Sequence, residues 1–239
     1  MNFSFFQGII LIVAVACPVL FSFAGATGDK GHTFVFRVYG VQPAEYSGLY
    51  YRGDKGGKKP LHFRKKHRSQ SFKGSLPEGE KFFKFYTRAE SVETGGEVFV
   101  PVATVKVQPA WQEVLFVFHS SRGRAAGGIN NPDVAAVEDG DAAFPAGTMR
   151  IMNITGRGIS GIVNRKRLAL RRDGLSAPVN ADDSGLVRVR FTVEGAARHY
   201  LIYQNEHFLS SGHRGLLILR APARKGSTRI SGYLLEGLP

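Results

Sequence analysis

The side chains best suited to metal binding or proton transfer in this 239-residue chain are its seven histidines. Three of them, His199, His207 and His213, are close enough in sequence to converge across a hairpin, but no carboxylate pattern completes a ligand set. The spacing therefore predicts no metal site and no cofactor. The other four are scattered along the chain: His32, His62, His67 and His119.

A short acidic segment, Glu138-Asp139-Gly140-Asp141, offers oxygen ligands for calcium. It lacks the longer alternation and the terminal Glu of a calcium-binding loop, so a solvated loop is the favoured interpretation. The alternative is that this segment docks against basic side chains of its own chain. Thiol chemistry is excluded from a chain cut after Ala26, because Cys17 is the only cysteine.

The sequence carries no Gly-x-Ser-x-Gly elbow, no His-Glu-x-x-His helix and no glycine-rich phosphate loop. A glycosidase needs only two carboxylates at no fixed spacing in sequence, and the 19 acidic residues leave such a pair open. We expect a protein that is not an enzyme, and a hydrolase with an unrecognised site remains an alternative.

The strongest chemical signal is a basic segment from residue 52 to 73, in which Asp54 is the only acidic residue. Such a surface attracts polyanions over roughly 8 Å at physiological salt. The alternative is a solvated face that keeps the protein soluble and discourages pairing between sheet edges. The candidate binding residues are Arg52, Lys55, Lys58, Lys59, Arg64, Lys65, Lys66, Arg68 and Lys73.

Aromatic side chains are interleaved with these cations, at Tyr50, Tyr51, Phe63 and Phe72. Rings of this kind stack on sugars or bases, but alternating aromatics more often belong to a core. No nucleic-acid-binding motif is present, so specific binding of nucleic acid is not expected. The whole chain has a formal net charge of +13, which reinforces the expectation of an anionic partner.

The elements that carry these residues are predicted to be strands, because the chain is rich in Gly, Phe and Tyr and shows period-2 alternation. Expected strands of the first half cover residues 33–39, 47–52, 60–65, 70–73, 81–87, 102–108 and 114–120. Those of the second half cover residues 148–154, 158–164, 167–171, 177–180, 186–194, 198–203, 215–220 and 229–235.

Two strands show contrasting patterns of burial. In residues 187–194 valine and phenylalanine alternate with polar side chains, which predicts one buried face and one wet face. Residues 114–118 are apolar throughout, so we expect both of their faces to be covered. The fold class predicted is all-β, with two tandem β-sandwich (immunoglobulin-like) domains.

The expected domains are residues 27–122 and 143–239, joined by an acidic linker at 123–142 that is rich in Gly and Ala. We expect the linker to hold one helical turn, at residues 131–133.

The two halves of the chain also resemble each other in sequence. Ser47–Arg52 followed by Pro60–Lys65 matches Ser160–Arg165 followed by Leu168–Arg172 in order and polarity. This pattern indicates two copies of one sandwich, the first with a longer hairpin loop at residues 53–59.

Residues 8–26 are almost wholly apolar and end in Ala24-Gly25-Ala26, the small-residue pattern that a signal peptidase reads. The sequence predicts a signal peptide over residues 1–26. Two alternatives stay open: a retained membrane anchor at residues 8–26, and a lipoprotein attached through Cys17.

Together these features predict a secreted or periplasmic binding module without enzymatic activity. Its basic surface would bind an anionic polysaccharide or lipid head groups of the envelope or matrix. The alternative is a structural or assembly component of the cell envelope that binds a protein through its sheet edges.

Overall fold

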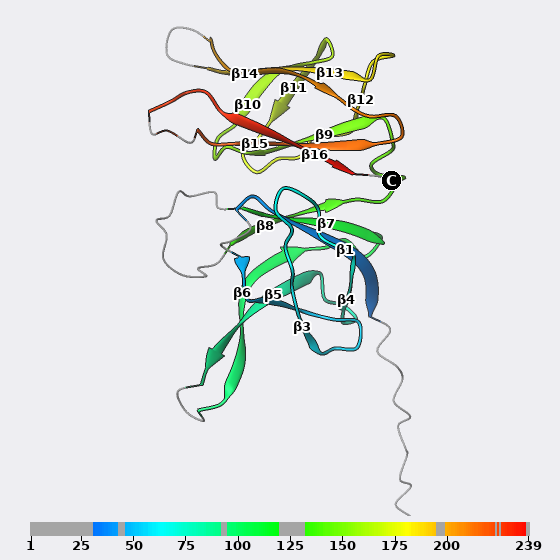
Figure 1. The fold of residues 1–239 in the computed structure, drawn as a ribbon, viewed down its shortest axis with the longest axis vertical. Helices are drawn as coiled ribbons and strands as arrows, with labels where there is room; N and C mark the ends of the chain where they lie inside the picture. The colour runs from blue at the N-terminus through cyan, green and yellow to red at the C-terminus, as the bar shows by residue number, and fades with distance from the viewer. Residues whose placement is uncertain are drawn as a thin grey trace, which may run out of the picture. The chain divides into compact units, whose positions relative to one another are not determined.

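The computed structural model describes residues 31–42, 46–91, 95–119, 132–194, 199–222, 224 and 226–237. These residues form sixteen strands and no α-helix, so the predicted all-β class is confirmed (Figure 1). The signal peptide expected at residues 1–26 lies outside the described residues. None of the described residues belongs to a helix able to cross a bilayer.

The first eight strands build two four-stranded sheets with the orders β4-β1-β7-β8 and β3-β2-β5-β6. Strand β1 lies between β4 and β7, and its pairing with β7 is parallel. All other pairs in these two sheets are antiparallel. The bounds are β1 His32–Gly40, β2 Leu49–Arg52, β3 Lys58–Pro60, β4 Phe72–Leu76, β5 Phe82–Glu90, β6 Glu97–Lys106, β7 Glu113–His119 and β8 Asp133–Glu138.

The last eight strands repeat this plan, with the sheet orders β12-β9-β15-β16 and β11-β10-β13-β14. Here β9 takes the place of β1 and pairs in parallel with β15. The bounds are β9 Thr148–Ile154, β10 Ile159–Val163, β11 Lys166–Leu170, β12 Val179–Asn180, β13 Leu186–Glu194, β14 His199–Phe208, β15 Arg214–Arg220 and β16 Ser231–Gly237.

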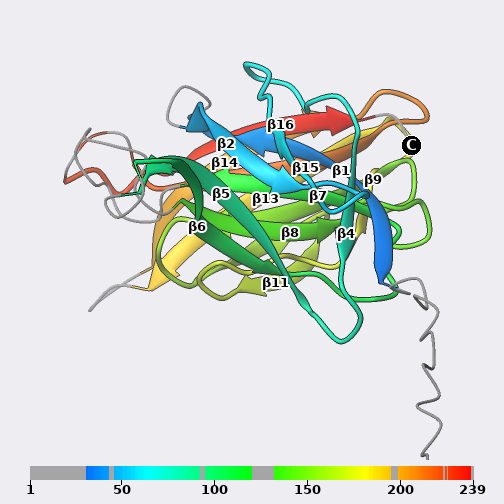
Figure 2. The ribbon, with the colours of Figure 1, turned by 90° about the horizontal axis from the view of Figure 1, so that it is seen from below.

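Each pair of sheets encloses a core of its own. In the first half, rings from β1, β5 and β7 meet between the two sheets, and Figure 2 shows β5 and β6 in front of β7 and β8. Phe83 and Phe116 stack with their ring centroids 5.5 Å apart, and Phe34 and Phe36 meet Phe116 at steep angles. The core of the second half lies between its own two sheets and consists mostly of aliphatic side chains, such as Ile151 from β9.

A third apolar cluster joins the two halves, because β7 and β8 face β9, β15 and β16 across it (Figure 1). Leu115 and Val117 point into this cluster while Phe116 points into the first core. Residues 114–118 are therefore buried on both faces, as their unbroken apolar run predicts. Leu216 and Ile218 on β15 point into this third cluster from the opposite side.

The region expected to be a linker contains a strand. Strand β8 pairs antiparallel with β7, from Val114 opposite Glu138 to His119 opposite Asp133. The helical turn expected at residues 131–133 does not form at Asp133, which already belongs to the β7–β8 ladder, and Asn131 lies outside the described residues. The sequence signal was weak because Asp133–Glu138 is a short edge strand with small side chains and intermediate burial.

The predicted internal repeat agrees with the strand order, but its register differs by three residues from the match in sequence. Tyr50 on β2 pairs with Tyr86, and Ser160 on β10 pairs with Thr192; in each copy the pairing with the next strand shifts register just before that second residue. Tyr50 therefore corresponds to Ser160 and not to Val163. The longer β2–β3 loop of the first copy is confirmed, since β10 and β11 are joined by only two residues.

One hydrogen-bonded serine is repeated in both copies. Ser69 Oγ accepts a hydrogen bond from the backbone N–H of Val38 at 2.9 Å and donates one to the carbonyl of Gln70. Ser176 makes the same bonds, accepting from the N–H of Ile151 at 2.8 Å. Each hydroxyl satisfies a buried amide in the central strand β1 or β9, which supports a common origin of the two halves.

Candidate anion-binding face

The nine predicted binding residues lie on several different elements. Arg52, Lys58 and Lys59 belong to the β2–β3 hairpin, and Lys55 lies in its turn. The exposed side chains of residues 64–66 lie in a second turn, closed by a bridge between Arg64 and His67. Lys73 is exposed on β4, at the edge of the other sheet.

Arg68 has a structural role and is not available for binding, since only 8% of its side chain is exposed. Its Nη1 donates to both carboxylate oxygens of Asp139, at 2.8 and 2.6 Å. Burial lowers the pKa of Arg68, and the charge of Asp139 opposes this shift. The acidic segment thus docks on its own chain, which was the alternative interpretation of the sequence. The cation it contacts is Arg68, one of the nine predicted binding residues.

Asp139 also approaches two further cations. Arg37 Nη1 lies 3.6 Å from it, and Nε of the fully buried Arg214, on β15, lies 3.7 Å from it. Arg214 Nη1 in turn donates to Asp141 at 2.8 Å. This buried ion cluster connects strands of both copies beside their shared apolar cluster.

Lys59 is engaged with Asp54 at the exposed tip of the β2–β3 hairpin, with Nζ 2.8 Å from Oδ1. The hydrogen bond with Lys59 lowers the pKa of Asp54, and the same bond raises the pKa of Lys59. This pair is solvated and contributes little to stability. It leaves Lys59 partly neutralised as a ligand for a polyanion.

The outer face of sheet β3-β2-β5-β6 gathers aromatic and basic side chains that the basic segment only partly contains. Phe83 and Phe85 point into the first core, so the alternate residues of β5 point outward. We call this surface the aromatic–basic face. Its members are Tyr50, Arg52, Lys58, Phe82, Lys84, Tyr86, Arg88, Phe99 and Lys106.

Pairing between the strands arranges these side chains in two rows. Tyr50 lies opposite Tyr86, and the row continues to a proline at each end, Pro60 on β3 and Pro101 on β6. This ring row crosses all four strands, a span of about 14 Å at about 4.8 Å per strand spacing.

The second row contains cations. Arg52 lies directly opposite Lys58, and by the register of β2 with β5 it is also level with Lys84. In the described part of the chain, no carboxylate lies within ion-pair distance of these three side chains. The cation row runs beside the ring row, about 7 Å away along the strands.

The rings hold some of these cations in place. Lys58 Nζ lies 3.3 Å from the ring centroid of Tyr86, and the Arg88 guanidinium lies 4.9 Å from that of Tyr50. Phe99 packs edge-on against Tyr50 with the centroids 5.1 Å apart. Cation–π contacts of this kind limit the motion of long side chains and so fix the positions of their charges.

Sequence reasoning missed six of the nine members of this face. Lys84, Arg88 and Lys106 lie outside the basic segment, and they join Arg52 and Lys58 only because β5 and β6 pair beside β2. The available signal was the alternation in residues 82–88, which places aromatic and basic side chains on the face opposite the core.

The second copy provides an internal comparison, because the same positions there carry different chemistry. Ser160 and Thr192 replace the two tyrosines, and Ile162 replaces Arg52 in the middle of the cation row. Glu206 replaces Lys106 and pairs with Arg188 at 3.1 Å. The sandwich fold therefore does not require the aromatic–basic face, since its own repeat folds without one.

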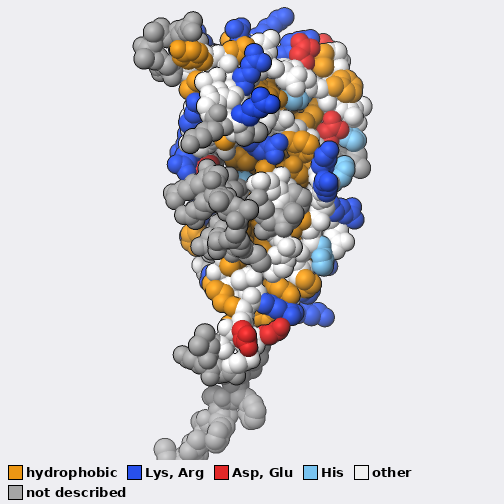
Figure 3. Space-filling view, turned by 60° about the vertical axis from the view of Figure 1, so that its left-hand side comes forward, with side chains coloured by type: hydrophobic (Ala, Val, Ile, Leu, Met, Phe, Trp, Pro, Cys, Tyr) orange, Lys and Arg blue, Asp and Glu red, His pale blue; other side chains and the backbone are white. Residues whose placement is uncertain are grey.

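Figure 3 shows Lys and Arg side chains in several separate groups over one side of the molecule, with apolar side chains between them. Exposed apolar residues also occur on the edge strands, including Val98 on β6 and Phe208 on β14. The positive charge is thus widely distributed, and the aromatic–basic face is distinguished by its ordered rows.

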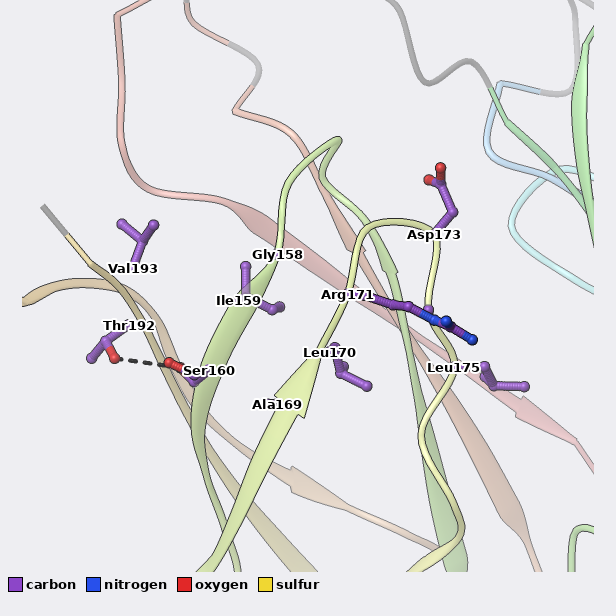
Figure 4. Close-up of a pocket in the computed structure, with 11 residues that line it drawn as sticks. Gly158, Ile159, Ser160, Ala169, Leu170, Arg171, Asp173, Leu175, Thr192 and Val193 are labelled. Carbon is purple, nitrogen blue, oxygen red and sulfur yellow. Dashed lines mark hydrogen bonds between the residues drawn. The ribbon is translucent and has the colours of Figure 1, made fainter.

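An open pocket of about 840 Å³ lies in the second copy, along β10, β11 and β13 (Figure 4). Its polar lining includes Ser160, Arg171, Asp173 and Thr192, and Thr192 Oγ1 lies 3.3 Å from the carbonyl oxygen of Ser160. The lining contains one carboxylate and no histidine. It therefore lacks the paired acid and base that would support the hydrolase alternative.

The histidines do not form a site within the described residues, where no group of three His, Cys, Asp or Glu side chains converges. His119 and His207 are buried, and desolvation lowers the pKa of both. His207 Nε2 is hydrogen-bonded to the hydroxyl of Tyr203 at 2.8 Å. These two side chains are parts of the cores.

Comparison with known proteins finds no matching family model and no matching curated protein. The fold therefore defines the class of the protein only as all-β, with four small sheets.

Proposed function

We propose that this protein is a binding module without enzymatic activity that recognises an anionic polymer through the aromatic–basic face. The observation that carries the proposal is the cation row, in which Lys58, Arg52 and Lys84 lie side by side on three neighbouring strands. Like charges directly opposite each other destabilise a sheet. A polyanion lying on the row removes this repulsion and gains attraction to all three charges.

The internal repeat supports the same proposal. Ile162 separates the two arginines of the equivalent row, Arg167 and Arg190, so that the second copy avoids three adjacent cations. A requirement for solubility alone would be met by either arrangement. The clustered arrangement in the first copy instead has the form of a binding surface.

The proposal also includes the finer fold and the location of the protein. Each copy would be an immunoglobulin-like sandwich, supported by its two packed four-stranded sheets. Residues 1–26 would be a signal peptide, and the protein would act outside the cytoplasm on an envelope or matrix polymer. We expect N-terminal sequencing of the exported chain to begin at Thr27, and an intact Met1 in that chain would contradict export by cleavage.

Neutralising the cation row tests the function. The triple variant Arg52→Ile, Lys58→Gln, Lys84→Gln should bind polygalacturonate and polyphosphate at least tenfold more weakly at low salt, because three ion pairs with the polymer are lost. Its affinity should also depend less on salt than that of the unmodified protein. Titration calorimetry at two salt concentrations measures both effects.

A matched control removes the same number of charges from the second copy. Lys166→Gln, Arg167→Gln, Arg190→Gln alters three exposed residues of β11 and β13 and should change the affinity less than threefold. Equal weakening by both triple variants would show that net charge alone drives binding. Absence of binding by the unmodified protein would reject the function altogether.

A further inference from the structure

Beyond the presence of charge, the aromatic–basic face has an order that specifies a kind of ligand. The ring row and the cation row are parallel to each other and perpendicular to the strands. A ligand that uses both rows must offer apolar ring faces along one side and negative charges along the other. It must also be long enough to cross four strands.

From this geometry we infer that the ligand is an acidic polysaccharide that lies across the strands, with sugar rings on the row Pro60, Tyr50, Tyr86, Pro101 and carboxylates against Lys58, Arg52 and Lys84. This inference rests on the proposed function and deepens it.

The ring row matches a sugar chain in shape. Tyrosine rings and proline rings present flat C–H-rich or π surfaces to the axial C–H groups of a pyranose, and these contacts bury apolar area without requiring hydrogen bonds. Tyr50 and Tyr86 are each partly exposed on the outer face of the sheet. Both prolines are exposed.

The cation row matches the charges of such a chain. Each sugar of a polyuronate carries one carboxylate, and neighbouring strands present the cations of the row about 4.8 Å apart. Arg52 offers a planar fork that binds a carboxylate through two hydrogen bonds, and the lysines on either side act as point charges. The contact of Lys58 with Tyr86 fixes its ammonium group over that ring, 3.3 Å from the centroid.

Other polyanions use the face less completely. Polyphosphate has charges but no rings, so it would leave the ring row without a partner. Lipid head groups present their charges in a plane and are not joined into a chain that crosses four strands. Single-stranded nucleic acid has rings and charges, and it is therefore the most demanding competitor in the test.

The experiment replaces the ring row with the residues of the second copy. The double variant Tyr50→Ser, Tyr86→Thr should bind polygalacturonate about tenfold more weakly, because two ring contacts with the sugars are lost. It should bind polyphosphate less than about threefold more weakly, because Lys58 and Arg88 keep their charges and lose only their contacts with the rings. Since Ser160 and Thr192 occupy the same positions in a folded repeat, the fold should tolerate these changes. Ser160→Ala, Thr192→Ala serves as the matched control and should leave both affinities unchanged.

Orientation is tested separately. Pro60→Ala and Pro101→Ala alter the ends of the ring row on β3 and β6, whereas Phe82→Ser alters a position further along β5. Binding of a sugar chain that crosses the strands should be weakened by the two proline substitutions and less by Phe82→Ser. The opposite result would show that it runs along β5 and would overturn the inferred direction.

The outcomes for the ligand class separate this inference from the proposed function. If the cation-row variant fails to bind while the ring-row variant binds polygalacturonate normally, the function stands and the inference is wrong. Tighter binding of oligodeoxythymidylate than of polygalacturonate at equal charge concentration would assign the face to single-stranded nucleic acid. Vesicles of phosphatidylglycerol that compete better than polygalacturonate would assign it to lipid head groups.

Discussion

Replacing Asp139 with asparagine is expected to lower the free energy of unfolding by about 3–5 kcal/mol, the usual cost of leaving a buried partner charge uncompensated. The carboxylate is 1% exposed and accepts two hydrogen bonds from Arg68. Removing its charge leaves Arg68 and the fully buried Arg214 close together with less compensation. Urea denaturation followed by circular dichroism measures the change.

The control for this experiment is Asp141→Asn. Asp141 also bonds to Arg214, but its side chain is 74% exposed, so water screens the charge. We expect a loss of less than about 1 kcal/mol. Equal losses of stability from the two substitutions would mean that the burial of Asp139 does not strengthen its ion pairs, and would contradict this prediction.

Replacing Phe116 with alanine is expected to lower the free energy of unfolding by about 3–5 kcal/mol, because it removes a large side chain from a packed core. Phe116 is fully buried at the centre of a group of rings. It stacks on Phe83 and meets Phe85 edge-on with the centroids 5.2 Å apart. Thermal and urea denaturation of the purified variant report the loss.

An exposed phenylalanine provides the comparison. Phe208 on β14 is 58% exposed, and Phe208→Ala should change the stability by less than about 0.5 kcal/mol. A small effect of Phe116→Ala, similar to that of Phe208→Ala, would be incompatible with the close packing between β5 and β7.

Local patterns in the sequence were sufficient to predict most of the strands. The alternation from Val187 to Val193 placed β13 correctly, and the unbroken apolar run on β7 correctly predicted burial on both faces. Strand β8 was missed because its small, partly exposed residues carry no period-2 signal. Its place is determined by hydrogen bonding to β7, which a local pattern does not contain.

The candidate site could be predicted only in part, because charge in the sequence does not reveal which face a side chain occupies. Arg68 belongs to the most basic segment but is buried against Asp139, 71 residues further along the chain. Lys84 is isolated in sequence but lies level with Arg52 through pairing of β2 with β5. Both outcomes depend on contacts between distant segments.

The parallel pairing of β1 with β7 has a consequence for biosynthesis. Val35 on β1 pairs with Glu113 on β7. Strand β7, which flanks β1 on one side, is therefore synthesised only near the end of the first copy. The same delay separates Met149 from Gly215 in the second copy. Because a ribosome releases the N-terminal part first, we expect neither half to close while it is still emerging. The first half can therefore close only after β7 and β8 have left the ribosome, once the chain has grown beyond Glu138.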